Sequence, residues 1–306
     1  MDPKVLFFFL LWYVINVVYN DTNKTVLKVL DLPWIVSCLQ LGLGLVFYVG
    51  PLWMTGLRKQ PKLSSENAMA ILPVALIHGI GQCVTVMSLG AGSLAFVNVV
   101  KSLEPLFNVL FGAIFMKDVL PWQVNACLLP VVGGVAIASA ADLSFTWDCF
   151  AFAMGSNVAF SLRGVLSKKS MGGNMGENMD AGNTFAVMTA FAFLAVLPVA
   201  VALEGPIVAT AWQAALATGT FTQNELIARI MASGLSFYLY NEVAFYTLDA
   251  VHPITHAVGN TIKRVILILF SVVRFGTPMT AQSALGSTIA IAGVFAYSVA
   301  KQIFKK

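Results

Sequence analysis

The most constraining feature of the sequence is a series of apolar runs about twenty residues long, separated by short polar or proline-containing breaks. A helix of about 20 apolar residues spans the hydrocarbon core of a bilayer, whereas barrel strands alternate in polarity over about ten residues. Only 10% of the residues are charged, against about 25% in soluble domains, so a water-exposed surface cannot be built from this chain. The sequence therefore predicts an all-α membrane protein.

The apolar runs divide the chain into ten predicted transmembrane helices. These are residues 5–28, 33–57, 66–89, 92–116, 121–140, 147–169, 181–203, 225–248, 252–275 and 280–303. Basic residues in the breaks are distributed unevenly. The side that holds both termini has Lys4, Arg58, Lys59, Lys62, Lys117, Lys168, Lys169, Lys301, Lys305 and Lys306. The other side has Lys24, Lys28, Arg229 and Arg274. This asymmetry predicts an even number of spans with both termini on the more positive side.

A weak internal repeat relates the two halves of the chain. Residues 94–139 align without gaps on residues 253–298, which places Gly134 on Gly293 and Phe111 on Phe270. Because each half has five spans, an odd number, the second copy must enter the membrane inverted. We therefore expect two inverted five-helix repeats, residues 1–141 and 142–306, with a substrate site between them near the membrane midplane.

Away from the loops and the polar ends of the predicted spans, six charged residues lie inside the membrane, namely Lys101, Glu104, Arg163, Glu242, Lys263 and Arg264. A charge at the centre of a membrane helix costs about 2.5–3.5 kcal/mol, so each should face a polar cavity or a partner. The repeat superposes Lys263 on Glu104, which lies one helical turn from Lys101. Lys101 and Lys263 should therefore face one central cavity from opposite repeats.

The two carboxylates are expected to form ion pairs, Glu104 with Lys101 and Glu242 with Arg264 or Arg163. Four cations against two acids still leave two positive charges without a counter-ion. A small dianion such as phosphate would supply the missing charge, and arginine suits its oxygens. Because an empty cavity with two unpaired cations is hard to close, this pattern also predicts obligatory exchange.

The remaining polar residues of the spans admit two interpretations. Tyr240, Thr85 and Gln82 could hydrogen-bond a ligand, or they could bond neighbouring helices. The cysteines and histidines are isolated in the sequence, so neither a metal site nor a cofactor is expected. These residues are Cys38, Cys83, Cys127, Cys149, His78, His252 and His256.

Two charged turns carry a recognisable pattern. They are Lys101-Ser102-Leu103-Glu104-Pro105 and Gly259-Asn260-Thr261-Ile262-Lys263-Arg264. They resemble the K-x-x-E-P and G-N-x-x-K-R elements of the plastid phosphate translocator family, within the drug/metabolite transporter superfamily. The likeness runs from about residue 5 to the C-terminus.

The resemblance implies a strict antiporter that exchanges inorganic phosphate for phosphorylated C3 metabolites by alternating access. The substrates would be triose phosphate, 3-phosphoglycerate or phosphoenolpyruvate, and the membrane a plastid inner envelope or a secondary-plastid (apicoplast-type) membrane. It also implies that Lys101, Lys263 and Arg264 clamp the phosphate, with Tyr240 as a further ligand. Thr85 and Arg163 fall on substrate-contacting positions.

Some positions depart from the family pattern. Gln82 stands where triose-phosphate members carry a histidine and where phosphoenolpyruvate-type members tend to carry an amide. Glu242 replaces a usual glutamine. This mixture favours a C3 substrate over hexose phosphate. Family precursors carry a transit peptide that this sequence lacks, so a mature form or an internal targeting signal is expected.

Three alternatives compete with the antiporter. A nucleotide-sugar transporter shares the superfamily, but a cluster of three cations suits a single phosphate group better. A membrane enzyme would need an acid/base or nucleophile constellation or an acidic metal site, and the histidines and carboxylates form none. An anion channel would release phosphate without a counter-substrate. The expected surroundings are membrane lipid, with a monomer or weak dimer and no nucleic acid.

Overall fold

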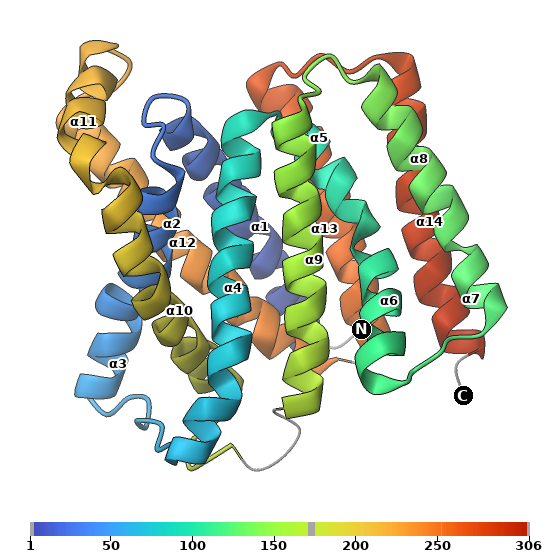
Figure 1. The fold of residues 1–306 in the computed structure, drawn as a ribbon, viewed down its shortest axis with the longest axis horizontal. Helices are drawn as coiled ribbons and strands as arrows, with labels where there is room; N and C mark the ends of the chain where they lie inside the picture. Colours follow the sequence, from blue (N-terminus) through green and yellow to red (C-terminus); the bar gives the residue numbers. More distant parts are fainter. Residues whose placement is uncertain (1–2, 171–174, 252, 305–306) are drawn as a thin grey trace.

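The computed structural model describes residues 3–170, 175–251 and 253–304, which form a bundle of helices (Figure 1). The first half contains α1 (Pro3–Leu27), α2 (Pro33–Gly44), a π-helical turn (Leu45–Val49), α3 (Gly50–Met54), α4 (Ser65–Ala91), α5 (Leu94–Val100), a 3-10 turn (Lys101–Leu103), α6 (Glu104–Met116), α7 (Trp122–Ala126) and α8 (Leu128–Ala141). The second half contains α9 (Trp147–Ser170), α10 (Ala181–Glu204), a 3-10 turn (Gly205–Ile207), α11 (Val208–Ala217), α12 (Gln223–Ala250), α13 (Pro253–Phe275) and α14 (Ala281–Phe304). Extended pairing in the described residues is limited to one isolated bridge between Lys62 and Glu177. The predicted all-helical class is confirmed.

Nine helical segments of the described chain are long and apolar enough to cross a membrane, from Val5–Leu27 to Ala281–Phe304. The predicted span at residues 225–248 falls on α12, a 28-residue helix that is not among the nine and that carries Glu225, Arg229 and Glu242. The count of ten spans and the inverted symmetry therefore remain predictions.

Several helices begin where a side chain accepts a hydrogen bond from the first turn. Ser64, Ser93, Asp180 and Thr222 precede α4, α5, α10 and α12 in this way. The α12 start is a full capping box, because Glu225 also accepts from the backbone N–H of Thr222 at 2.8 Å. These caps satisfy N–H groups that a helix start otherwise leaves without a partner.

The fourth predicted span is a broken helix, and Pro105 is the reason. A proline nitrogen has no hydrogen to donate, so the carbonyl of Lys101 cannot receive the usual bond from residue 105. The backbone N–H of Glu104 donates a hydrogen bond to that carbonyl instead, and residues Lys101–Leu103 form a 3-10 turn. The break between α5 and α6 thus lies at the charged turn itself.

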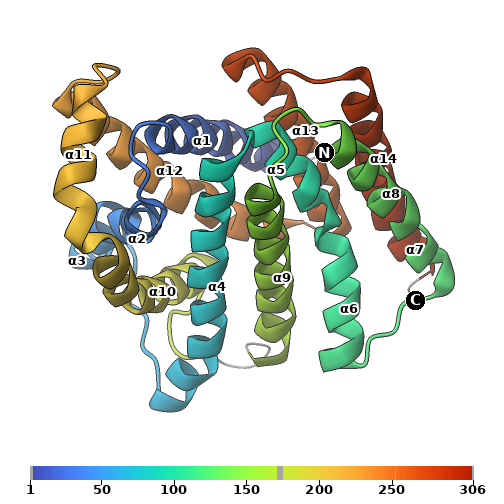
Figure 2. The same cartoon turned by 45° about the horizontal axis from the view of Figure 1, so that its top comes forward.

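Helices α8 and α14 pack side by side through small residues (Figures 1 and 2). A Cβ added to Gly134 would lie 2.6 Å from the carbonyl oxygen of Gly286, and one added to Gly293 would lie 2.8 Å from Val131. Such contacts exclude side chains and let the backbones approach closely, as small residues do between membrane helices. The two glycines matched by the sequence repeat therefore lie in one interface.

The bundle has two ends, which we call the termini face and the opposite face. The loops at 55–64 and 117–121 and the end of α14 lie at the termini face, at the bottom of Figure 1. The loops at 28–32, 142–146 and 276–280 lie at the opposite face. The predicted positive side corresponds to the termini face, although its Lys305 and Lys306 lie outside the described residues.

Candidate substrate cavity

A cavity of about 430 Å³ lies in the middle of the bundle. Its walls come from α1, α4, α5, α6, α9, α10, α12 and α13 together with the 3-10 turn at Lys101. Its lining extends from Leu89, near the opposite face, to Ser167 and Lys168 at the C-terminal end of α9, near the termini face (Figure 1). A space of this volume is in the range of ordinary small-molecule sites.

One wall of the cavity brings two cations to a single aromatic ring. The Lys101 ammonium lies 5.3 Å from the centre of the Phe160 ring, and the Arg163 guanidinium lies 5.0 Å from it. Lys101 also donates to Thr85 Oγ1 at 3.2 Å. Arg163 donates to Nδ1 of the buried His78 at 2.9 Å. Arginine has no acceptor, so His78 must receive this bond on an unprotonated Nδ1, as a neutral imidazole.

A second wall is formed by the first half of α13 and by Trp12 of α1. The Lys263 ammonium lies 4.8 Å from the centre of the Trp12 ring, and Trp12 stacks on His256 with 4.9 Å between ring centres. Arg264, next in the chain, pairs with Glu104 of α6. Aromatic faces attract these cations but do not neutralise them.

The charge of the cavity wall is strongly unbalanced. Its described lining contains the basic residues Lys101, Arg163, Lys168, Lys263 and Arg264 and one acidic residue, Glu104. Within the described chain, no carboxylate lies within 4.0 Å of the charged groups of Lys101, Arg163 or Lys263. The cavity therefore presents cations that a bound anion could neutralise.

The structure places most of the predicted site residues together. Lys101, Lys263, Arg264, Tyr240, Thr85 and Arg163 all line this one cavity. Gln82 is buried but does not line it, and instead donates to the Tyr19 hydroxyl and to Gln40. Residues 82 and 85 point about 60° apart around a helix, so Thr85 faces the cavity and Gln82 lies behind its wall.

The predicted ion pairs are wrong in their partners. Glu104 pairs with Arg264 and not with Lys101, because Lys101 is directed toward Thr85 on α4. Glu242 pairs with neither Arg264 nor Arg163, but with Arg58, which the sequence had placed in a loop. Arg58 does lie in the loop after α3, but its side chain reaches back into the bundle, and only 12% of that side chain is exposed.

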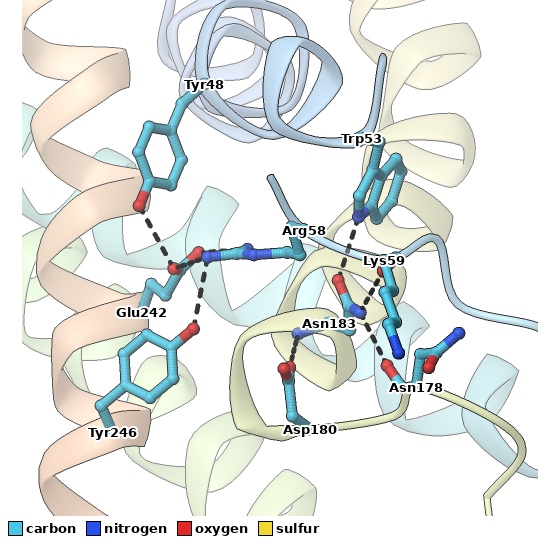
Figure 3. Close-up of polar contacts among 9 residues, drawn as sticks. All are labelled: Tyr48, Trp53, Arg58, Lys59, Asn178, Asp180, Asn183, Glu242 and Tyr246. Carbon is cyan, nitrogen blue, oxygen red and sulfur yellow. Dashed lines mark hydrogen bonds and ion pairs between the residues drawn. The ribbon is translucent and has the colours of Figure 1, made fainter. Parts of the chain in front are cut away.

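A second set of buried polar residues, which we call the Arg58 cluster, consists of Tyr48, Arg58, Glu242 and Tyr246 (Figure 3). These residues do not line the cavity. The Arg58 guanidinium forms two hydrogen bonds with the Glu242 carboxylate, at 2.5 and 3.1 Å, and one with the Tyr246 hydroxyl at 3.2 Å. Tyr48 donates to the same carboxylate at 3.5 Å. One cation and one acid therefore balance here.

A neighbouring set of bonds fixes the loops around the Arg58 cluster. The Asn183 side chain accepts from the Trp53 indole at 3.0 Å and donates to the carbonyls of Lys59 and Asn178 at 2.9 and 2.6 Å (Figure 3). Asp180 accepts from the Asn183 backbone. The termini-face ends of α3, α10 and α12 are thus joined by a dense polar network.

At the opposite face, polar contacts tie α1 to α4 and α13. Lys24 donates to the carbonyls of Leu89 and Gly92, at 2.5 and 2.6 Å, and Arg274 of α13 donates to Asp21 at 2.9 Å. These contacts join α1, α4 and α13, three of the helices that line the cavity, at the end of the cavity nearest the opposite face. The cavity therefore lies on the termini-face side of this set of contacts.

Charge-based reasoning missed the contribution of α1. Trp12, Asn16, Tyr19 and Asn20 all line the cavity. Their spacing of three to four residues puts them on one helix face, and this polar and aromatic stripe in an apolar span was the signal that could have identified them. For metals, the described residues contain no group of three or more His, Cys, Asp and Glu side chains placed to hold an ion.

Comparison with known proteins connects this arrangement to a transporter family. The family model described as the Triose-phosphate Transporter family matches residues 3–298. The chain is 38% identical over 296 residues to the chloroplastic phosphoenolpyruvate/phosphate translocator 1 of Oryza sativa subsp. japonica, covering 97% of this chain and 71% of the relative. It is likewise 38% identical to the chloroplastic triose phosphate/phosphate translocator of Flaveria pringlei, covering 96% and 71%. A solved protein structure that is 15% identical superposes over the full length of both chains with a TM-score of 0.56, which indicates a shared fold.

Proposed function

Since the chain belongs to the Triose-phosphate Transporter family, we propose that it exchanges inorganic phosphate for phosphorylated C3 metabolites across a plastid-type membrane. Triose phosphate, 3-phosphoglycerate and phosphoenolpyruvate are the proposed counter-substrates. The family relatives are transporters and not enzymes. The nucleotide-sugar alternative is not favoured, because the relatives described above are phosphate translocators.

The observation that carries the proposal is the excess of cations around the cavity. Lys101 and Lys263 reach it from α5–α6 and α13, and neither has a carboxylate partner within 4.0 Å in the described chain. A phosphate dianion supplies two negative charges and several acceptor oxygens. Binding it therefore removes the cost of holding these ammonium groups away from water without a counter-ion.

We assign roles to the lining residues on this basis. Lys101, Lys263 and Arg264 would clamp the phosphate group, with the Tyr240 hydroxyl as a further ligand. Arg264 would share its donors between the substrate and Glu104, since a guanidinium has five N–H groups. Thr85 would contact the substrate while it holds Lys101, and Arg163 would contact it from the α9 side.

Coupling follows from the same charges. An empty cavity contains repelling cations, and closing it on both faces would remove them further from water. A bound anion lowers that cost, so the closed state is favoured only when substrate is present. Opening to the opposite face would break the contacts of Lys24 with Leu89 and Gly92 and the Asp21–Arg274 pair. We propose that this alternation moves two inverted repeats, residues 1–141 and 142–306.

Labelled-phosphate uptake into liposomes tests the proposal. Vesicles would be preloaded with phosphate, dihydroxyacetone phosphate, phosphoenolpyruvate, glucose 6-phosphate, a nucleotide monophosphate or buffer alone. Uptake only into vesicles that contain phosphate or C3 phosphates is the expected result. Equal uptake into empty vesicles would show a channel or uniporter, and uptake driven by the nucleotide alone would overturn the C3 assignment.

A further inference from the structure

Two side chains of α9 contact the broken turn between α5 and α6. Helix α9 lies beside α5, the 3-10 turn and α6 (Figures 1 and 2). The Asn157 side-chain amide donates to the Val100 carbonyl at 2.9 Å, and the Ser161 hydroxyl donates to the Glu104 carbonyl at 3.1 Å. Asn157 and Ser161 are four residues apart, so both lie on one face of α9. This face therefore contacts both ends of the turn that carries Lys101.

The break at Pro105 explains why the Val100 carbonyl accepts from a side chain. In a regular α-helix the backbone N–H of Glu104 would donate to Val100. Here that N–H donates to Lys101, because Pro105 has no N–H to offer. The Val100 carbonyl has thus lost its α-helical donor, and the Asn157 amide donates in its place. Val100 is 0% exposed and Asn157 is 1% exposed, so water does not compete for this bond.

The rest of the Asn157 amide is poorly accommodated. Its Oδ1 atom is buried and has no hydrogen-bond partner among the described residues. The cost of such an acceptor is at least comparable to the net gain from a single hydrogen bond. The stability of the fold therefore gives little reason for an amide at this position, and the bond to Val100 is the feature that remains to be explained.

This bond fixes the peptide from which Lys101 projects. A peptide unit is planar, so the Val100 carbonyl and the backbone nitrogen of Lys101 move as one body. The Lys101 ammonium donates to Thr85 Oγ1 at 3.2 Å and lies 5.3 Å from the centre of the Phe160 ring, on the cavity wall. Phe160 also belongs to α9, three residues after Asn157. Helix α9 therefore holds Lys101 both through the peptide that precedes it and at its ammonium group.

From this geometry we infer that Asn157 is a positioning residue for phosphate binding, which directs the Lys101 ammonium into the cavity by fixing the Val100–Lys101 peptide. Asn157 itself does not line the cavity. The inference rests on the proposed function and deepens it. Lys101 is proposed to bind the phosphate group, which inorganic phosphate and the C3 phosphates share. Loss of Asn157 should therefore weaken the binding of all of them alike, without changing the preference among them.

The first test is Asn157→Leu, which keeps the approximate size of the side chain and removes the amide. The apparent KM for phosphate, dihydroxyacetone phosphate and phosphoenolpyruvate should each rise by about three- to tenfold in liposome exchange. The maximal exchange rate should change by less than about twofold, because the lost interaction acts on binding. The unfolding temperature should stay near that of the wild type, since a bond and an unpaired acceptor are removed together. A lower unfolding temperature with unchanged KM values would overturn the inference and show a purely structural role.

Lys101→Met identifies the group through which Asn157 acts. Without the ammonium there is nothing for Asn157 to direct, so adding Asn157→Leu to Lys101→Met should change no KM further. If the two effects multiplied instead, Asn157 would act through another part of the site, and the inference would be overturned.

Pro105→Ala tests whether Asn157 replaces the missing helical donor. An alanine supplies an N–H for the Lys101 carbonyl, which frees the N–H of Glu104 for Val100. Asn157→Leu should therefore raise KM less in the Pro105→Ala background than in the wild type. An equal rise in both backgrounds would contradict the proposed link between the break and Asn157.

Ser156→Ala is the matched control. Ser156 precedes Asn157 in α9 and is 0% exposed, but its hydroxyl donates to Ala153 of its own helix at 2.8 Å. It should leave every KM unchanged. If Asn157→Leu does not fold, Asn157→Ala removes the same donor with a smaller side chain and is judged by the same KM values.

Phosphate binding would also be measured without transport, as the shift in unfolding temperature that inorganic phosphate causes in detergent. Asn157→Leu should reduce this shift, and Ser156→Ala should not. A wild-type protein that binds phosphate but does not exchange it would overturn the proposed function alone, because the binding shifts would still test the role of Asn157. A full shift in Asn157→Leu would overturn that role.

Discussion

The central cavity and the Arg58 cluster both hold charged side chains inside the bundle, but their charges are balanced differently. In the Arg58 cluster one guanidinium meets one carboxylate through two hydrogen bonds, and two tyrosines bond the same pair. In the cavity, five basic residues share a lining with Glu104 alone among the described acids. Buried charge therefore does not by itself identify a binding site. The informative feature is a charge for which the protein supplies no partner.

This difference predicts opposite consequences for removing a charge. In the cavity, loss of a cation should reduce binding and spare the fold, because that cation is a cost to the folded state. In the Arg58 cluster, loss of either partner should harm the fold and spare binding.

Lys263→Ala should give the largest functional effect. It removes one charge-assisted contact to phosphate, which corresponds to a loss of about 10- to 100-fold in exchange. The unfolding temperature should stay equal or rise, since an unpaired buried cation is removed. Lys28→Ala is the matched control, because Lys28 lies 4.9 Å from the Phe275 ring, much as Lys263 lies from Trp12, but outside the cavity. Near-normal exchange by Lys263→Ala would remove Lys263 from the site.

Glu242→Met should give the largest effect on stability. It leaves Arg58 buried without its counter-ion, which costs about 3–5 kcal/mol. Exchange per folded molecule should change less than about threefold, because Glu242 does not line the cavity. Arg58→Met should act similarly, and the double variant should be more stable than either single variant, since no unpaired charge remains. A wild-type unfolding temperature for Glu242→Met would contradict this account of the cluster.

Glu104→Gln should have an intermediate effect, and it should change substrate binding and the exchange rate in opposite directions. Glu104 is the one carboxylate in the described lining and it pairs with Arg264. Neutralising it should free that guanidinium for the substrate and lower the apparent KM for phosphate by about three- to tenfold. The maximal exchange rate should fall, because the empty, more positive cavity becomes harder to close. A raised KM would show that Glu104 orients Arg264 for binding.

Local pattern was sufficient to predict most of this architecture. The sequence placed spans at 33–57 and 147–169, and the helices run over Pro33–Met54 and Trp147–Ser170, because apolar length and turn residues are encoded locally. The convergence of Lys101 and Lys263 followed from the repeat. Arg58 could not be placed, because its partner lies 184 residues away and its neighbours Lys59 and Gln60 read as a loop.

The position of Gln82 was also beyond the sequence. Gln82 and Thr85 lie within one turn of α4, and both are polar residues in an apolar span. Which of them faces the cavity depends on the rotation of α4 against α1 and α9. That rotation is set by packing across the bundle, and no local pattern reports it.

The smallest effect is expected at the Lys62–Glu177 ion pair, which is short at 2.7 Å but largely exposed. The hydrogen bond from Lys62 lowers the pKa of the Glu177 carboxyl, and the bond to Glu177 raises the pKa of the Lys62 ammonium. The carboxyl contribution is thus present above its ordinary pKa of 4.5 and lost as the pH falls through the lower folded value. The ammonium contribution is present below 10.5 and lost as the pH rises through the higher folded value. Glu177→Gln should therefore shift the unfolding temperature by no more than about 1 °C, equally at pH 6 and pH 9, with exchange unchanged. Suppose that Glu177→Gln lowered the unfolding temperature as much as Glu242→Met. The distance between the charges, and not their burial away from water, would then determine how much an ion pair contributes to the stability of this protein.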